Sequence, residues 1–464
     1  MQFQYKFSKL LVKLFLLLSI CMQVACKKAW LDAKPNKSLV VPTTIADYQA
    51  ILDNNTGNSL FNFQQPGLNE VGTDDYYLDY NSWQSLDNIQ ERNAYIWAPE
   101  IFAGENAYDW QYAYTRILNA NIVLDGIGNI SAAPSNLSNR NNVQGTALFY
   151  RAYDFYSLAQ EFAKSYDASS ASGDLGIPLR TTADINVKSV RASVKETYEK
   201  IISDLVLSKK LLPDLALFPT RPGKSAVFGL LSRVYLSTEN YDQAFLYADS
   251  CLNLNNHLLD FNTLSSTAFT PITRFNPEVI YHHMLAAYSA LNNYMPYLNV
   301  DSTLYNSYAT NDLRKKVFFK NSSGKITFNA SYSGTNTFFG GLATDEIYLI
   351  RAECYARKNQ VSSAMADLNK LLSQRWATGT FVPYTATNAD EALLKILQER
   401  RKELVYRGLR WTDLKRLNRD SRFSKTLVHV LNGKTYTLPP NSDRYIYPIP
   451  QAEISLSGMQ QNPR

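Results

Sequence analysis

Between residues 69 and 97, aromatic side chains alternate with carboxylates, amides and an arginine. Sugars expose patches of C–H beside hydroxyl groups, so a carbohydrate site needs aromatic platforms flanked by polar groups. This mixture therefore indicates such a site, with Asp75, Tyr77 and Trp83 as our ligand-binding candidates. Trp97 is expected in the core. The members of the stretch are Asp74, Asp75, Tyr76, Tyr77, Tyr80, Asn81, Trp83, Gln84, Arg92 and Trp97.

A second stretch of the same character runs from Tyr281 to Tyr297. It contains two adjacent asparagines between tyrosines, and we select Tyr288 and Tyr294 as further aromatic platforms. The whole chain has 31 Tyr against 22 Phe and 6 Trp. Because tyrosine also packs well at half-buried positions, packing inside a minor lobe remains the alternative for each of these aromatic residues.

Other chemistry receives little support. Asp74, Asp75 and Asp79 could hold a calcium ion or serve a glycosidase, but a solvated loop explains them better, because no partner residues are identifiable from the sequence. We therefore predict no cofactor and no metal, with calcium possible but unsupported. The chain lacks His-Glu-x-x-His, zinc-ligand spacing and a Gly-x-Ser-x-Gly elbow. These observations favour a protein that is not an enzyme.

The N-terminal segment predicts a lipid anchor. Three lysines precede a short apolar run over residues 14–20, and Ala25 then precedes Cys26. The run is too short to cross a bilayer of roughly 30 Å. We predict a lipoprotein signal peptide over residues 1–25 and acylation of Cys26, which would tether residues 26–464 to a membrane. An ordinary secretory signal is the alternative.

Charge gives little reason to expect a polyanionic partner. The formal net charge is +6, and three of the positive charges lie in the predicted signal peptide. The chain contains no basic block of the kind that binds nucleic acid, so we predict no nucleic-acid partner.

Hydrophobic periodicity predicts a mainly α fold. Apolar residues recur at spacings of three and four over 106–126 and 143–164, which indicates two helices. A further helix begins near Ser193, where Glu196 completes a capping box, and ends before Pro213.

Two later stretches share one pattern. Tyr235 is followed nine residues later by Ala244, and Tyr355 is followed at the same distance by Ala364, each time across a short polar turn. A small residue is needed where two antiparallel helices approach closely, and the spacing is typical of tetratricopeptide helix pairs. We therefore predict a tetratricopeptide-like helical-repeat scaffold.

Long irregular segments interrupt this scaffold at about 54–100 and 260–340, which are rich in Asn, Ser, Thr, Gly and Tyr. Ordered loops on a rigid frame commonly carry function, so we expect a loop-rich minor lobe there. Asn432-Gly433 predicts a short β-hairpin.

Residues 399–416 form the densest charged block, and their pattern predicts two helices separated by a turn. Local helical spacing would pair Glu403 with the arginine four residues on, and Asp413 with Lys415 or Arg416.

This block closely resembles the signature of the SusD/RagB family, outer-membrane nutrient-binding lipoproteins of Bacteroidetes-type bacteria. Its two parts are Glu399 to Leu404 and Gly408 to Arg416. Other stretches resemble further blocks in the family's order: 26–35, 110–121, 151–152, 176–179, 224–236, 346–353 and 448–454.

The resemblance implies a tetratricopeptide-like helical core with irregular loops that form a ligand face. It implies an outer-membrane location, lipid-anchored and facing the cell surface, and a SusC-like TonB-dependent transporter as partner. It also implies that the charged block is architectural rather than a ligand site.

Three functional classes remain. The leading one is non-catalytic capture of oligosaccharide for delivery to the transporter. The second is capture of peptides for a similar transporter, in which Asn side chains and backbone groups would recognise an extended chain. The third, a surface hydrolase, is disfavoured by the missing motifs.

Overall fold

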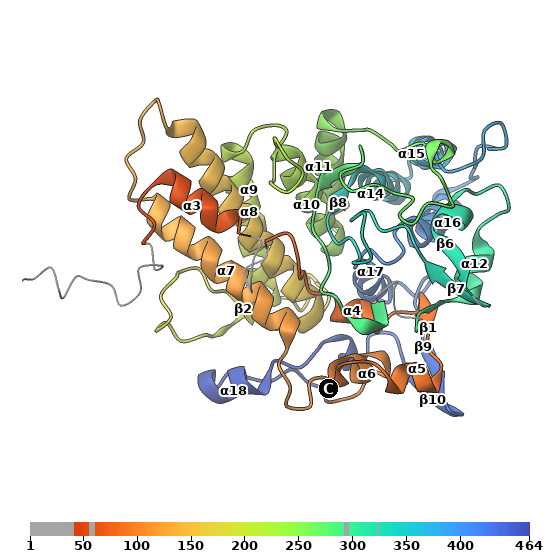
Figure 1. Ribbon diagram of the computed structural model, residues 1–464, viewed down its shortest axis with the longest axis horizontal. Helices are drawn as coiled ribbons and strands as arrows, with labels where there is room; N and C mark the ends of the chain where they lie inside the picture. The colour runs from red at the N-terminus through yellow and green to blue at the C-terminus, as the bar shows by residue number, and fades with distance from the viewer. Residues whose placement is uncertain (1–40, 55–60, 292–296, 323) are drawn as a thin grey trace, which may run out of the picture. The chain divides into compact units, whose positions relative to one another are not determined.

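Antiparallel helix pairs form the frame of the protein (Figure 1), as seen in a computed structural model that describes residues 41–54, 61–291, 297–322 and 324–464. Thr44–Arg464 form one compact unit. The fold is mainly helical, as predicted. Cys26 and the predicted signal peptide lie outside the described residues.

The first part of the frame contains the helices predicted from periodicity. α7 (Tyr108–Ile127) packs against α8 (Leu137–Phe162), and α9 (Val194–Leu211) packs on the other side of α8. α9 begins with the predicted capping box, in which the Ser193 hydroxyl accepts from the Glu196 N–H at 3.1 Å. α3 (Ile45–Leu52) crosses α7 where Gly126 has no side chain, and a Cβ there would lie 2.1 Å from the Tyr48 hydroxyl.

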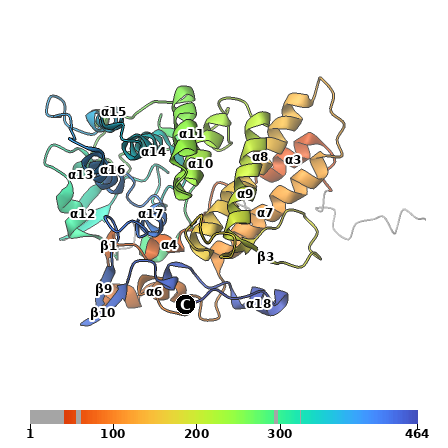
Figure 2. The ribbon, with the colours of Figure 1, turned by 180° about the vertical axis from the view of Figure 1, so that it is seen from behind.

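The two predicted repeats are helix pairs. α10 (Lys224–Ser237) pairs with α11 (Tyr241–Leu254), and α14 (Thr344–Arg357) pairs with α15 (Val361–Ser373). Ala244 and Ala364 are fully buried in these pairs, which confirms the role expected of the small residue. Figures 1 and 2 show α10 and α11 between the α7–α9 group and the α14–α15 pair.

The irregular segments contain short elements where we expected loops. The first holds α4 (Leu68–Val71), β1 (Tyr76–Tyr77), α5 (Tyr80–Gln84) and α6 (Ile89–Tyr95). The second holds β4 (Val279–Tyr281), β5 (Asn299–Val300), α12 (Ser302–Ser307), α13 (Arg314–Val317), β6 (Phe319–Ser322), β7 (Lys325–Phe328) and β8 (Leu342–Ala343). We call them the first and second insertions. They are too short for hydrophobic periodicity to reveal, and side-chain caps begin several of their helices.

Strands pair only two at a time among the described residues. β1 pairs with β5, β4 with β8, and β6 with β7, all antiparallel. β2 (Leu175–Pro178) pairs with β3 (Arg191–Ser193) in the loop before α9. β9 (Leu427–Leu431) and β10 (Lys434–Leu438) form the predicted hairpin, with positive φ at both Asn432 and Gly433.

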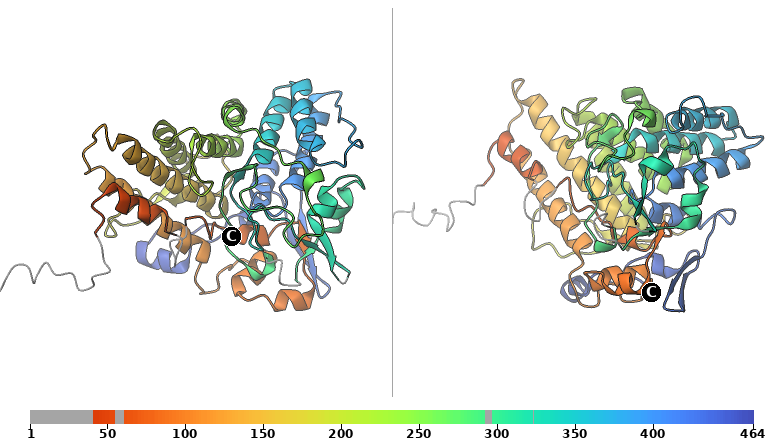
Figure 3. Two further views of the ribbon diagram at one scale, coloured as in Figure 1. Left: turned by 45° about the horizontal axis from the view of Figure 1, so that its top comes forward. Right: turned by 45° about the vertical axis from the view of Figure 1, so that its right-hand side comes forward.

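α16 (Ala389–Glu403) and α17 (Arg410–Leu417) hold the charged block, and α18 (Gln451–Ser457) follows near the C-terminus. The turn between α16 and α17 requires a φ of +70° at Gly408. Figure 3 shows the C-terminal hairpin at the same edge as the first insertion. Stacking of His429 on Tyr95, with ring centroids 4.0 Å apart, joins them there.

The charges of this block are buried and paired across long stretches of sequence. Glu403 binds Arg314 at 2.9 Å and Arg375 at 2.7 Å, where the helical spacing predicted a pair with Arg407. Arg407 instead binds Asp345, at 3.0 Å. The local prediction was wrong because burial makes each charge need a close partner, and the nearest ones come from other elements.

The same pattern continues on both helices. Arg400 binds Asp413 at 2.8 Å, and Asp413 also binds Arg416 at 2.9 Å, which confirms one of the two predicted partners. Arg416 reaches Glu353 on α14 at 2.6 Å. Lys415 donates instead to the backbone carbonyls of Gln160 and Ala163 at the end of α8. Its ammonium therefore meets the negative end of that helix.

We expect Glu403→Gln to lower the free energy of unfolding by about 3 kcal/mol, because it removes the carboxylate charge between two buried guanidinium groups. Urea denaturation followed by circular dichroism would measure this. Glu199→Gln on α9, whose exposed partner Lys195 lies 3.9 Å away, is the control and should change stability by less than about 0.5 kcal/mol. Equal effects of the two substitutions would contradict a structural role for the network.

Candidate ligand-binding surface

An exposed group of three aromatic side chains lies on the first insertion. We call Tyr77, Tyr80 and Trp83 the aromatic platform. Tyr77 is 46% exposed and Tyr80 36% exposed, while Trp83 is half-buried. The rings of Tyr80 and Trp83 stack with centroids 5.8 Å apart, because residues three apart lie on one face of α5.

Strand pairing decides which tyrosine of β1 faces solvent. Tyr76 lies opposite Val300 and is buried, while Tyr77 lies opposite Asn299 and is exposed, as alternation along a strand requires. Asn299 donates its side-chain amide to the Tyr77 hydroxyl at 2.5 Å. The second insertion therefore positions Tyr77, although the two residues are far apart in the sequence.

Asp79 fixes the start of α5, which carries the other two rings. Its carboxylate accepts from the Ser82 N–H at 2.8 Å and from the Lys325 ammonium at 3.1 Å. The hydrogen bond from the Ser82 N–H, with further bonds from the Ser82 hydroxyl and Lys325, holds the pKa of Asp79 at about 2. Asp79 is therefore an anion at neutral pH and a strong helix cap.

A hydrogen bond to α6 fixes the indole of Trp83. Its Nε1–H donates to the backbone carbonyl of Arg92 on α6 at 3.0 Å. Gln84 donates to the Tyr80 hydroxyl at 2.8 Å, and Asn81 next to it is exposed. The platform thus presents ring surface beside amide and carboxylate groups, the combination that a sugar ring with its hydroxyls can use.

Two of the predicted site residues lie inside the protein. Asp75 is 1% exposed, and its carboxylate accepts from Arg401 at 2.9 Å. Tyr288 is 3% exposed, and its hydroxyl donates to Asp109 at 2.8 Å. Burial raises the pKa of Asp75, against the opposing effect of Arg401 and Arg410. Neither side chain offers a surface on which a ligand could stack, so we leave both out of the platform.

The contacts of Tyr288 explain its burial. Asp109 on α7 also accepts from the backbone N–H groups of Gly67 and Leu68, each at 2.7 Å. Burial raises the pKa of Asp109, and it raises that of neighbouring Glu161 still further, with the charge of Asp109 adding to the effect. Tyr288 therefore connects the second insertion to a buried carboxyl group of the frame.

The remaining predicted residues have different outcomes. Tyr77 on β1 and Trp83 on α5 both lie on the first insertion, while Tyr294 lies outside the described residues. Trp97 is buried and donates to the Gly72 carbonyl at 2.9 Å, in the core as expected. The described residues contain no group of three or more His, Cys, Asp or Glu side chains placed to hold a metal ion.

Tyr80, Asn299 and Lys325 were not selected from the sequence. Tyr80 carried a usable signal, because Asp79 is a good helix cap and Tyr80 and Trp83 then fall three apart on the helix it begins. Asn299 and Lys325 carried none, since only tertiary contacts bring the second insertion to the first.

Comparison with known proteins identifies the family to which this helical frame and its two insertions belong. Residues 29–236 match a family described as starch-binding and associating with the outer membrane, and residues 288–464 match the SusD family. Together the two matches cover more than half of the chain. The chain belongs to the SusD/RagB family, as its sequence predicted.

Individual relatives agree with this assignment. SusD-like protein P2 of Formosa agariphila is 30% identical over 148 residues, which make up 31% of this chain and 26% of that protein. The match thus spans about a quarter of this curated relative. A SusD superfamily protein from Bacteroides thetaiotaomicron has the same fold, with a TM-score of 0.71 at 21% identity over 91% of this chain and 100% of that one. A laminarin binding SusD-like protein aligns with a TM-score of 0.59 at 17% identity, over 90% of this chain and 97% of that one.

We expect Asp79→Ala to destabilise α5 by about 1 kcal/mol, because it removes the helix cap and the contact to Lys325. Amide hydrogen exchange within residues 80–84 should become about fivefold faster at pH 7. The depressed pKa means that the stabilisation is complete above the unfolded value of about 4 and is lost as the pH falls through about 2.

The two proteins should therefore become alike in α5 below about pH 2. Asn388→Ala, which removes the cap of α16, is the control and should leave exchange in α5 unchanged. Unchanged exchange in Asp79→Ala at pH 7 would show that the cap does not hold the platform.

Proposed function

We propose that this protein captures oligosaccharides at the cell surface and delivers them, without cleaving them, to a SusC-like TonB-dependent transporter in the outer membrane. The observation that carries the proposal is the aromatic platform, in which two exposed tyrosines and the half-buried Trp83 lie among amide and carboxylate groups. A stacked ring pair offers the flat apolar surface that the C–H face of a sugar requires.

The family adds support of a general kind. One matching family model is described as starch-binding and associating with the outer membrane, and one structural relative is a laminarin binding protein. These descriptions concern those proteins. For this chain, the support for glycan binding comes from the platform.

A lipid anchor on Cys26 is the attachment we propose. None of the helices in the described part of the chain combines the length and the apolar character needed to cross a membrane. Acylation of Cys26 would hold the folded unit at the outer membrane beside its transporter.

Glycan capture can be tested by measuring binding of laminarin and starch oligosaccharides to the purified protein by calorimetry. We expect Trp83→Ala and Tyr77→Ala each to weaken binding about tenfold, because each removes a ring surface that contacts the sugar. Phe218→Ala, which removes an exposed aromatic ring between α9 and α10, is the matched control and should bind normally.

The same material separates the alternatives. Peptide binding that survives both platform substitutions, with no glycan binding, would favour the peptide-capture function. Release of shorter sugars during incubation would establish a hydrolase. Full glycan affinity in both Trp83→Ala and Tyr77→Ala would reject the platform as the binding surface.

The anchor has its own test. Cys26→Ala should move the protein from the membrane fraction to the soluble fraction after cell lysis, and mass spectrometry should find acyl chains on the wild-type protein only. Substitution of buried Cys354 by Ala is the control and should leave the protein in the membrane fraction. Membrane association of Cys26→Ala equal to that of the wild type would contradict a lipid anchor on this residue.

A further inference from the structure

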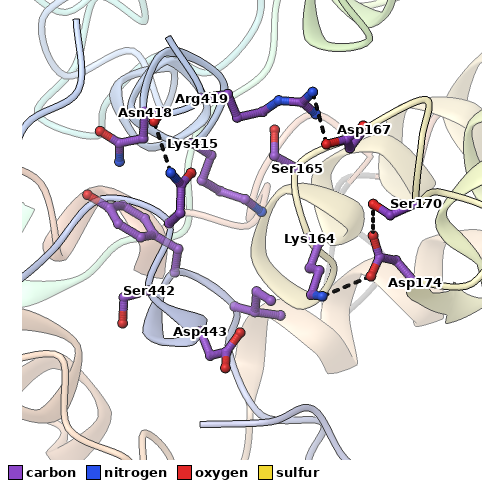
Figure 4. A pocket seen from close by; sticks show the side chains of 13 residues that line it. Lys164, Ser165, Asp167, Ser170, Asp174, Lys415, Asn418, Arg419, Ser442 and Asp443 are labelled. Atoms are coloured by element: carbon purple, nitrogen blue, oxygen red, sulfur yellow. Dashed lines mark hydrogen bonds and ion pairs between the residues drawn. The ribbon is translucent and has the colours of Figure 1, made fainter. Parts of the chain in front are cut away.

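A cavity of about 440 Å³ lies away from the platform, where three segments of the chain meet. They are the loop after α8, the end of α17, and the segment around the 3₁₀ helix Asp443–Tyr445. Its volume falls within the range of roughly 300–1,000 Å³ typical of small-molecule sites. Figure 4 shows the polar side chains that surround it.

The charges that line the cavity are balanced. Lys164 binds Asp174 at 2.8 Å, and Arg419 binds Asp167 at 3.1 Å, so the opposite charges within each pair neutralise each other. The hydrogen bond from Lys164 to Asp174 raises the pKa of Lys164, which keeps its ammonium charged. The remaining titratable groups are Lys415, whose pKa burial lowers to about 7, and Asp443, which is exposed. Asp443 has no ion-pair partner in the described part of the chain.

Several hydrogen-bonding groups of the lining are left to pair with something else. In its protonated form Lys415 has three N–H donors and uses two of them on backbone carbonyls. The side-chain amide NH₂ of Asn418 and the hydroxyl of Tyr445 are buried close to each other, and neither has a well-formed hydrogen bond to any other described group. A buried polar group without a partner lowers stability by about 1–3 kcal/mol, so such groups indicate a missing partner.

We propose that this cavity binds a single sugar unit, as a second ligand site separate from the platform. Hydroxyl oxygens of the sugar would accept from the Lys415 ammonium and the Asn418 amide, and a sugar hydroxyl would donate to the Asp443 carboxylate. Ile446 and the ring of Tyr445 supply the apolar wall against which the C–H face of a sugar ring can lie.

The lining selects against other small ligands of this size. A phosphate or other compact anion would gain little from Lys164 and Arg419, because aspartates already neutralise both. The carboxylate of Asp443 would also repel it. A flat apolar ligand would leave the Lys415 and Asn418 donors unpaired, which is unfavourable. A polyol matches donors and acceptors that are spread around the whole wall. A neutral hexose and a uronic acid share this chemistry, and they differ in whether a carboxylate meets Lys415.

The test uses the folded full-length protein with D-glucose, D-glucuronate and L-serine as probes. Saturation-transfer NMR would detect binding, and titration would give dissociation constants, which we expect to be roughly millimolar for either sugar. Asp443→Asn should weaken sugar binding about tenfold by removing the charged acceptor. Ser165→Phe, which fills the cavity from the loop after α8, should abolish binding.

Two controls separate this site from the platform. Asp242→Asn changes an exposed aspartate on α11 that pairs with Lys358 at 2.8 Å, and it should leave sugar binding unchanged. Trp83→Ala should also leave monosaccharide binding unchanged, while it weakens oligosaccharide binding at the platform. Failure of the platform and failure of the cavity are therefore distinguishable.

The outcome decides both the existence and the chemistry of the site. Binding of glucose supports a neutral sugar, and tighter binding of glucuronate supports an acidic one. The proposal is overturned if neither sugar binds, if L-serine alone binds, or if sugar binding survives both Asp443→Asn and Ser165→Phe.

Discussion

Neutralisation of buried charge is the constraint on which the rest of the structure depends. Glu403 lies between the guanidinium groups of Arg314 and Arg375, and Arg375 continues to Glu278 at 2.7 Å. A buried carboxylate without its partner is strongly destabilising, so these side chains must meet for the chain to fold. The second insertion supplies Glu278 and Arg314. Its position on the frame therefore depends on these ion pairs together with its buried aromatic residues, such as Phe318 and Phe328.

The same requirement fixes the first insertion and, through it, the aromatic platform. Arg401 on α16 binds Asp75 at 2.9 Å, and Arg410 on α17 binds Asp74 at 2.7 Å. β1 begins immediately after these aspartates, so the strand starts from a fixed point and its alternation turns Tyr77 outward. The charged block thus fixes the position of the proposed platform, while its own side chains are mostly buried.

The frame was predictable from sequence because its signals are local. Helical periodicity, the Ser193 capping box and the Asn432-Gly433 turn each concern residues close together in the chain, and each predicted element is present. Burial of Asp75 and Tyr288 was not predictable in this way. The partners Arg401 and Asp109 are far away in sequence, and aromatic residues beside polar ones look alike whether they face a ligand or a buried carboxylate.

The contacts that hold the frame and those that hold the platform also differ in how much substitution they tolerate. The frame is held by paired charges in the interior. Removal of one partner there leaves the other charge unpaired in a low-dielectric environment. The platform is held by a helix cap, strand alternation and neutral hydrogen bonds at the surface, each worth about 1 kcal/mol. Substitution of Tyr77 or Tyr80 therefore removes little stability, because these rings are exposed, whereas Trp83 also packs against the core. A protein built in this way can exchange the exposed aromatic residues of its insertions, and under the proposed function its ligand with them, while the ion pairs keep the insertions in place.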